Sequence, residues 1–194
     1  MKPIRIAVAL GAAGLFLGAM AGPAFADDAA LSTGSSATAT ASVIAGDRTA
    51  TLAGPVAFGS AVAAAHTDTA LSPVSTDVVV NDLSASDAGW NVTIVAGDLT
   101  GPVNANTGVA VRIAAANLSV SSYGTLASSP GDMSNIKAGT PASIGTSIAL
   151  LSAPVLSGMG DYTQPFYLGL VVPANSLAGA YSGTLTVTIV PAGV

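Results

Sequence analysis

Two stretches in which apolar and polar residues alternate most constrain what this chain can fold into. In WNVTIVA, residues 90–96, the tryptophan and every second residue after it are apolar, and in AYSGTLTVTIV, residues 180–190, Leu, Val and Ile alternate with Thr. Successive side chains of a β-strand point to opposite faces, so this period of two predicts strands with one buried face. A slip of one residue would expose the whole apolar row of the second segment, so its register is well specified.

Composition supports strands throughout the chain. The chain has no Glu and only five Lys and Arg residues, so the usual surface helix formers are scarce. Ser, Thr, Val, Gly and Asp take their place, and these residues favour strands and turns. Two alanine triplets, at 63–65 and 114–116, could each form a helical turn. The composition therefore predicts an all-β protein.

Further strands are expected along the rest of the chain. Residues 37–44 and 48–52 are predicted to form a hairpin, and residues 109–120 form one strand or two. The serine-, glycine- and proline-rich stretch 121–143 is predicted to be a long loop that could carry function. The other expected strands are residues 55–61, 76–82, 90–96, 147–153, 165–173 and 180–190. About eight or nine strands at this spacing predict an antiparallel β-sandwich of Ig-like or Greek-key type, in a single domain over residues 37–194.

The N-terminus has the pattern of a secretory signal peptide. Two basic residues, Lys2 and Arg5, precede an apolar run over residues 6–21, and Ala-Phe-Ala at 24–26 follows. This pattern predicts cleavage after Ala26, with residues 27–36 as a flexible leader. The apolar run is shorter than the roughly 20 residues of a membrane span, although an uncleaved anchor is the alternative. No later stretch is long enough to span a bilayer, so we expect no membrane span after cleavage.

Charge and cysteine content restrict the partners. After cleavage, the cations Arg48, Arg112 and Lys137 face ten aspartates. Nucleic acid and anionic lipid both need clustered Lys or Arg, so neither is an expected partner. The chain has no Cys, so it forms no disulfide, has no thiol chemistry and carries no lipoprotein anchor. An exported protein of this kind depends on packing and sheet hydrogen bonds, as is common for bacterial surface proteins.

Two motifs resemble the WxL-domain family of bacterial cell-surface proteins. They are GWNVTI at 89–94 and PANSLAGAYSGTLTVTI at 173–189, and the resemblance extends over about residues 37–190. Val92 stands where the family has Leu, and the closing strand has Val-Thr-Ile at 187–189 in place of the second Trp motif. The resemblance implies a β-rich fold, a location at the cell surface and non-covalent attachment to peptidoglycan.

The single tryptophan has two interpretations. Trp90 with Asp82, Asp87 and Asp98 could form a sugar-binding platform, since pyranose rings stack on exposed aromatic faces and carboxylates hold hydroxyl groups. Alternatively, Trp90 leads the inward row of its strand and is the largest anchor of the core, where it would bury roughly 200 Å². The alternation favours the core. These four residues are nevertheless the candidate ligand contacts.

Other chemistry finds little support in the sequence. His66, the single histidine, lies two residues before Asp68, but no G-x-S-x-G or other nucleophile motif accompanies them, so a structural or exposed loop histidine is favoured. Several aspartates could offer oxygen ligands to calcium, but their spacing matches no dedicated calcium loop and suits ordinary turns. They are Asp27-Asp28 and the Gly-Asp pairs at 46–47, 97–98, 131–132 and 160–161. We therefore expect no catalytic residues, no metal and no cofactor.

Three functions are consistent with these patterns. The first is an exported, non-enzymatic β-sandwich at the bacterial cell surface that binds wall peptidoglycan or polysaccharide, or other surface proteins. The second is a subunit of a pilus- or coat-like polymer, in which residues 27–44 donate a strand to a neighbouring copy. The third is a carbohydrate-active enzyme, which would need a carboxylic acid with a raised pKa.

Overall fold

The protein is represented by a computed structural model that describes residues 41–61, 67–86 and 88–192. This part of the chain is all-β, as predicted, and every strand pairing in it is antiparallel. Its helical content is one 3-10 turn, η1 (Ala115–Asn117). The compact unit described below begins at Ser42. The predicted signal peptide and leader, His66 and Asp87 lie outside the described residues.

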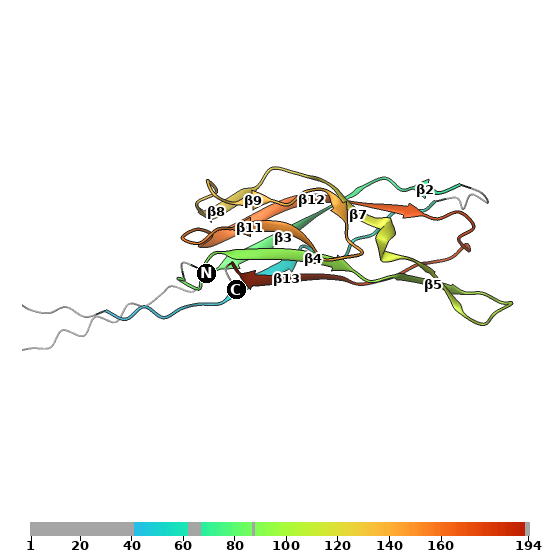
Figure 1. Ribbon diagram of the computed structural model, residues 1–194, viewed down its shortest axis with the longest axis horizontal. Helices are drawn as coiled ribbons and strands as arrows, with labels where there is room; N and C mark the ends of the chain where they lie inside the picture. Colours follow the sequence, from blue (N-terminus) through green and yellow to red (C-terminus); the bar gives the residue numbers. More distant parts are fainter. Residues whose placement is uncertain (1–40, 62–66, 87, 193–194) are drawn as a thin grey trace, which may run out of the picture. The chain divides into compact units, whose positions relative to one another are not determined.

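The strands form two main sheets and a small ribbon (Figure 1). The first sheet has the strand order β1 (Arg48–Leu52), β3 (Val74–Asp82), β12 (Gly160–Val172), β7 (Leu118–Tyr123) and β10 (Ala142–Ser143). Two further strands, β2 (Thr69–Ala70) and β8 (Ala127–Gly131), also pair with β12. The second has the order β13 (Leu185–Pro191), β4 (Trp90–Ala96), β11 (Ile148–Ala153), β9 (Lys137–Ala138). The ribbon joins β5 (Leu99–Val103) and β6 (Ala110–Ile113).

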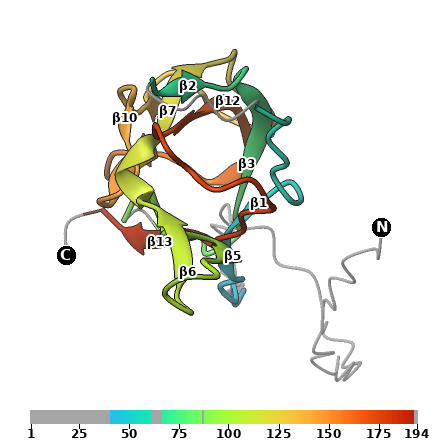
Figure 2. The same ribbon diagram turned by 90° about the vertical axis from the view of Figure 1, so that its right-hand side faces the viewer.

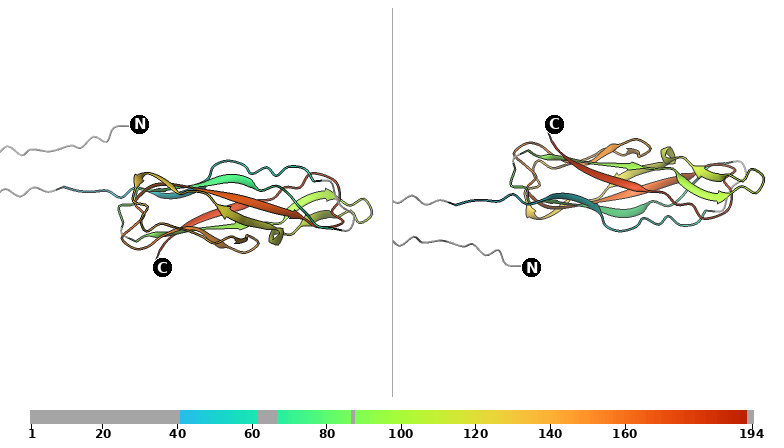
Figure 3. Two further views of the ribbon diagram at one scale, coloured as in Figure 1. Left: turned by 90° about the horizontal axis from the view of Figure 1, so that it is seen from above. Right: turned by 90° about the horizontal axis from the view of Figure 1, so that it is seen from below.

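The two sheets face each other as the layers of a sandwich. Figure 2 shows β2, β7 and β12 in one layer and β13 in the other, and in Figure 3 the strands of both layers run in the same general direction. Trp90 of β4 and Tyr162 of β12 meet across the layers, with ring centroids 5.7 Å apart. Their contact places the hydrophobic core between the sheets.

Consecutive strands repeatedly change layers. β3 is followed by β4 in the opposite sheet, and β11, β12 and β13 then alternate between the two. Such crossing connections are those of Greek-key sandwiches, including the jelly roll. The immunoglobulin order differs, because there two pairs of consecutive late strands each stay within one sheet. The Greek-key form of the predicted sandwich therefore describes this chain better than the immunoglobulin form.

The predicted alternation of β4 is confirmed residue by residue. Its burial changes with every position, and Trp90, Val92 and Ile94 are fully buried. Strand β12 supplies the opposing row, in which Tyr162, Phe166 and Leu168 are also fully buried. Since β4 lies between β13 and β11, and β12 between β3 and β7, both rows belong to central strands of their sheets.

Several expected elements differ in the structure. The predicted hairpin between residues 37–44 and 48–52 is wrong for its described part, because β1 pairs with β3 and residues 41–47 have no regular structure; residues 37–40 lie outside the described residues. Strand β3 carries the fully buried Val78 and Val80, so pairing with it adds β1 to the main core, which a hairpin of small residues would not do. The predicted loop at 121–143 contributes the short strands β8, β9 and β10, which attach it to both sheets.

Residues 109–120 agree with the prediction of one strand or two, whereas two other segments differ from what was expected. Residues 109–120 form the two strands β6 and β7, separated by η1 at the second alanine triplet. Residues 55–61 were expected to be a strand, but they have no strand partner in the described structure. In the final segment the strand begins only at Leu185, and residues 176–184 run as an irregular chain apart from one bridge at Ser182.

Candidate functional site

Trp90 is part of the core and does not form an exposed platform. Its exposed fraction is 0%, and its indole Nε1 donates a hydrogen bond of 2.9 Å to the carbonyl oxygen of Gly158. Gly158 has φ +93°, and a Cβ at this position would collide with the indole ring. The ring is tilted by 59° against Tyr162. Every side of the indole is therefore occupied, and no face remains on which a sugar could stack.

Asp82 lies in a buried ion pair at the end of β3. Its Oδ2 is 3.0 Å from Arg48 Nε, and neither side chain is more than 12% exposed. The other oxygen, Oδ1, accepts hydrogen bonds from the Ser84 amide (3.0 Å) and the Ser84 hydroxyl (2.6 Å). Arg48 also donates to the hydroxyls of Ser84 and Ser86, at 3.0 Å each. The carboxylate thus attaches β1 to the turn after β3, through hydrogen bonds at Oδ1 and charge attraction at Oδ2, so its role is structural.

Asp98 lies beyond the other end of β4. Its Oδ1 accepts a 3.0 Å hydrogen bond from the Ala115 amide, and its Oδ2 is 3.7 Å from Arg112 in a largely exposed pair. Asp82 precedes β4 and Asp98 follows it, and a strand of seven residues is about 20 Å long. The two described carboxylates therefore do not converge on Trp90, and the hypothesised sugar platform is not assembled from them.

Two other described aspartates, Asp68 and Asp132, hold loops and turns. Asp68 accepts a hydrogen bond from the Ala174 amide at 2.9 Å, and Asp132 accepts one from the Ser134 amide at 2.9 Å. The hydrogen bonds from Ser134 lower the pKa of Asp132. Within residues 41–61, 67–86 and 88–192, no group of three or more His or acidic side chains is placed to hold a metal ion.

Tyr162 combines a buried ring with a polar edge. Its hydroxyl lies 3.0 Å from the carbonyl oxygen of Met159 and 3.1 Å from that of Asp132. Burial of the side chain, and then the negative charge of Asp132, raise the pKa of Tyr162 above its usual value of 10.0. The hydroxyl thus holds the loop before β12 against the loop after β8, in the layer opposite Trp90.

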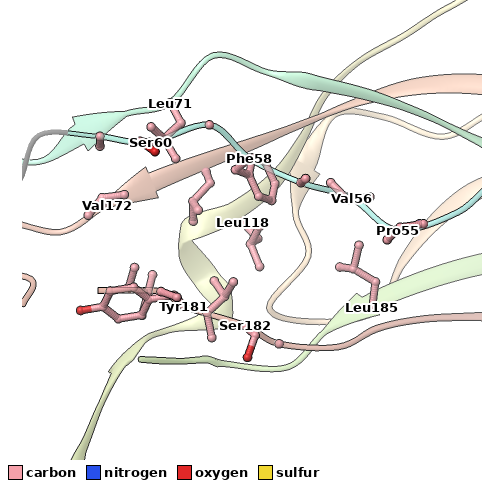
Figure 4. A pocket seen from close by; sticks show the side chains of 18 of the residues that line it. Pro55, Val56, Phe58, Ser60, Leu71, Leu118, Val172, Tyr181, Ser182 and Leu185 are labelled. Carbon is pink, nitrogen blue, oxygen red and sulfur yellow. The ribbon is translucent and has the colours of Figure 1, made fainter. Parts of the chain in front are cut away.

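A hollow of about 810 Å³, lined by many apolar side chains, lies between two irregular segments of the described structure (Figure 4). Its walls are the segment 53–61, which continues from β1, and the segment 176–185, which leads into β13. Between these walls the floor is made by residues of β6, β7 and β12, including Leu118 and Val172. We call this hollow the apolar groove.

The first wall of the groove resembles a strand that lacks a partner. Its side chains alternate in burial: Val56 and Phe58 are half-buried and pack against the core, while Pro55, Ala57 and Gly59 are exposed. Within the described part of the chain, no backbone hydrogen bond joins residues 55–61 to another backbone group. The wall therefore has the side-chain pattern of a strand together with free backbone donors and acceptors.

The second wall is unpaired only in its first part, because Ser182 and Thr184 hydrogen-bond to the backbone of Thr100 and Gly97. Residues 177–181 make no backbone-to-backbone hydrogen bond with any described residue. Tyr181 is held in place by a 2.8 Å hydrogen bond from its hydroxyl to the Leu177 carbonyl, and its ring packs where a Cβ on Gly101 would collide with it. Leu177 is 37% exposed, so a large apolar side chain faces solvent at this wall. Together the walls form an apolar slot in which residues 55–61 and 177–181 make no backbone-to-backbone hydrogen bond with a described residue.

The described lining of the groove is uncharged. Among the described residues its lining contains no Asp, His, Lys or Arg; its polar side chains are the hydroxyls of Ser, Thr and Tyr181. The sequence indicated one wall, through the short apolar strand predicted at residues 55–61. It could not show that this segment has no partner, because pairing is decided by residues distant in the chain.

The chain has no detectable similarity to known proteins: no family model matches it, and neither a curated protein nor a solved structure does so significantly. The resemblance to the WxL-domain family therefore stays a prediction. No helix among the described residues is both long and apolar enough to cross a membrane.

Proposed function

We propose that this protein is an exported, non-enzymatic cell-surface protein that works by binding an extended, apolar peptide segment in the apolar groove. The observation that carries the proposal is the pair of partly unpaired walls around an apolar hollow of about 810 Å³. This volume lies within the roughly 300–1,000 Å³ typical of binding pockets. An extended peptide added to such an edge would gain main-chain hydrogen bonds and place alternate side chains in the hollow.

The chemistry of the groove favours a peptide over a sugar polymer. Val56, Phe58 and Leu185 contribute hydrocarbon surface, whereas polysaccharides present hydroxyl groups that need polar partners. The one tryptophan that could have stacked on a sugar is buried in the core. Wall polysaccharide, the ligand that the WxL resemblance implies, is the competing hypothesis that the experiment must separate.

The proposal of a non-enzymatic role is supported by the hydrogen bonds that the aspartate side chains make within the protein. Asp82, Asp98 and Asp132 each accept hydrogen bonds from the protein itself, and none of them lines the groove. The proposal of export rests on the signal-peptide pattern at residues 1–26.

The test uses the mature chain, residues 27–194, and a fluorescein-labelled peptide that alternates Val and Thr over eight residues between lysine pairs. We expect saturable binding by fluorescence polarisation, and at least a tenfold loss of affinity in Leu177→Asp. The matched control is Val109→Asp, since Val109 is 64% exposed and lies outside the groove. A peptide with Pro at every second position cannot donate backbone hydrogen bonds there and should not bind.

Co-sedimentation with purified peptidoglycan separates the competing hypothesis. Binding to peptidoglycan without binding to the alternating peptide would contradict the proposal and favour the polysaccharide. Equal peptide affinity in Leu177→Asp and the wild-type chain would contradict the assignment to the groove.

A further inference from the structure

We infer that the occupant of the apolar groove is the N-terminal segment ATATASVI, residues 37–44, of a second copy of this chain, so that copies join head to tail. This inference rests on the proposed function, because it names the peptide that the groove binds. The sequence predicts strands at 37–44 and at 55–61. In the described structure residues 41–44 and 55–61 both lack a strand partner, and pairing between copies would give each segment one.

The donor segment ends in unusually exposed apolar side chains. Val43 and Ile44 are 84% and 89% exposed, the highest values among the large apolar residues described. They lie in a stretch without regular structure immediately before β1. These two adjacent β-branched side chains give the segment an apolar surface that a partner can cover. The segment 37–44 carries no charge, as suits a groove without charged lining residues.

The position of the donor segment favours a second copy over its own chain. The amide of Gly46 donates to the Leu83 carbonyl (2.8 Å), and the Leu83 amide donates to Asp47 (3.0 Å). These bonds hold the chain at the end of β1 where Arg48 pairs with Asp82. The segment 42–46 therefore leaves the sheet at this end.

The groove lies at the other end of the same strand. Strand β1 runs from Arg48 to Leu52, and the first wall of the groove continues from there over residues 53–61. In Figure 1 the blue stretch before β1 and the loop side of β5 lie at opposite ends of the sandwich. A segment returning to its own groove would have to reverse direction and pass the whole of β1. A neighbouring copy can present the segment directly.

The dimensions of donor and acceptor agree. Eight extended residues span about 26 Å, and the nine residues of the first wall span about 30 Å. Ala37, Ala39, Ala41 and Val43 share one face of the donor, which would enter the groove, while the hydroxyl-bearing residues between them point outward. A donor end and an acceptor end on opposite sides of one molecule make a heterologous contact, which propagates into rings or filaments.

The experiment uses two complementary variants of the mature chain. Val43→Asp/Ile44→Asp damages only the donor segment, and Leu177→Asp damages only the groove. We expect the wild-type chain to form concentration-dependent oligomers by size exclusion with light scattering, and each variant alone to be monomeric. Mixing the two variants should produce heterodimers and no larger species, since one intact donor and one intact groove remain. Val109→Asp is the control and should oligomerise like the wild type.

A chain shortened to start at Ala45 distinguishes the possible failures. It should be monomeric and should bind a labelled peptide of residues 37–44. If it binds the alternating Val/Thr peptide but not the 37–44 peptide, the inference fails and the proposed function stands. If it binds neither peptide, both fail. If it binds the 37–44 peptide while the intact chain stays monomeric at all concentrations, the segment occupies its own groove and the second-copy inference is overturned.

Discussion

Trp90→Phe is the substitution that most directly tests the account of the core. The smaller ring keeps the aromatic contact with Tyr162 but loses the indole N–H that donates to the Gly158 carbonyl at 2.9 Å. Gly158 is buried, so its carbonyl oxygen would remain without a partner. We expect the core to keep its fold and lose stability.

The size of this loss follows from three contributions. An unpaired buried carbonyl costs about 1–3 kcal/mol. The apolar surface lost with the second ring, roughly 40 Å², contributes about 1 kcal/mol. The void left behind adds a further cost of about the same size. We therefore expect the free energy of unfolding to fall by about 3–5 kcal/mol, which for a domain of this size lowers Tm by about 6–20 °C.

The measurement is urea denaturation followed by far-ultraviolet circular dichroism, because the substitution removes the single tryptophan fluorophore. Tyr167→Phe is the control: Tyr167 is 39% exposed on the same strand as Tyr162, and the change should alter stability by less than about 0.5 kcal/mol. In the wild-type chain, tryptophan emission should be blue-shifted and resistant to iodide quenching. A Trp90→Phe protein as stable as the wild type, or a freely quenched tryptophan, would refute the buried and hydrogen-bonded indole.

Three further perturbations probe other parts of the sandwich. Asp82→Asn leaves Arg48 buried without its counter-charge. It should lower the free energy of unfolding by about 3–5 kcal/mol in urea denaturation, whereas a loss below about 1 kcal/mol would mean that the ion pair is solvated. The folded-state pKa of Tyr162 is raised above 10.0, so its stabilising contribution is complete below pH 10 and is lost as pH rises through the folded pKa. Alkaline unfolding should therefore be shallower in Tyr162→Phe, and identical pH slopes would contradict this. Gly89 has φ +62°, and Gly89→Ala puts a Cβ 2.5 Å from the Ala153 carbonyl oxygen. This substitution should lower the free energy of unfolding by about 2–4 kcal/mol, measured by thermal unfolding. An unchanged Tm would show that the turn before β4 adapts freely.

The sequence alone was sufficient for the fold class and for the inward face of the principal strands. The alternation in residues 90–96 predicted the buried row of β4, including Trp90, because side-chain direction in a strand depends only on the local pleat. The second alanine triplet likewise marks the 3-10 turn η1 between β6 and β7. The carboxylates Asp82 and Asp98 were identified as polar candidates, but their separation and structural roles were not.

Tertiary structure decided which strands pair and where pairing is missing. The choice of β3 as the partner of β1, the ion pair between Arg48 and Asp82, and the gap beside residues 55–61 all depend on residues that are far apart in the chain. A local pattern states that a segment can be a strand, whereas its partner is selected by the apolar surface that the complete sandwich buries. For this reason the apolar groove, with its two partly unpaired walls, became visible only when both sheets were in place.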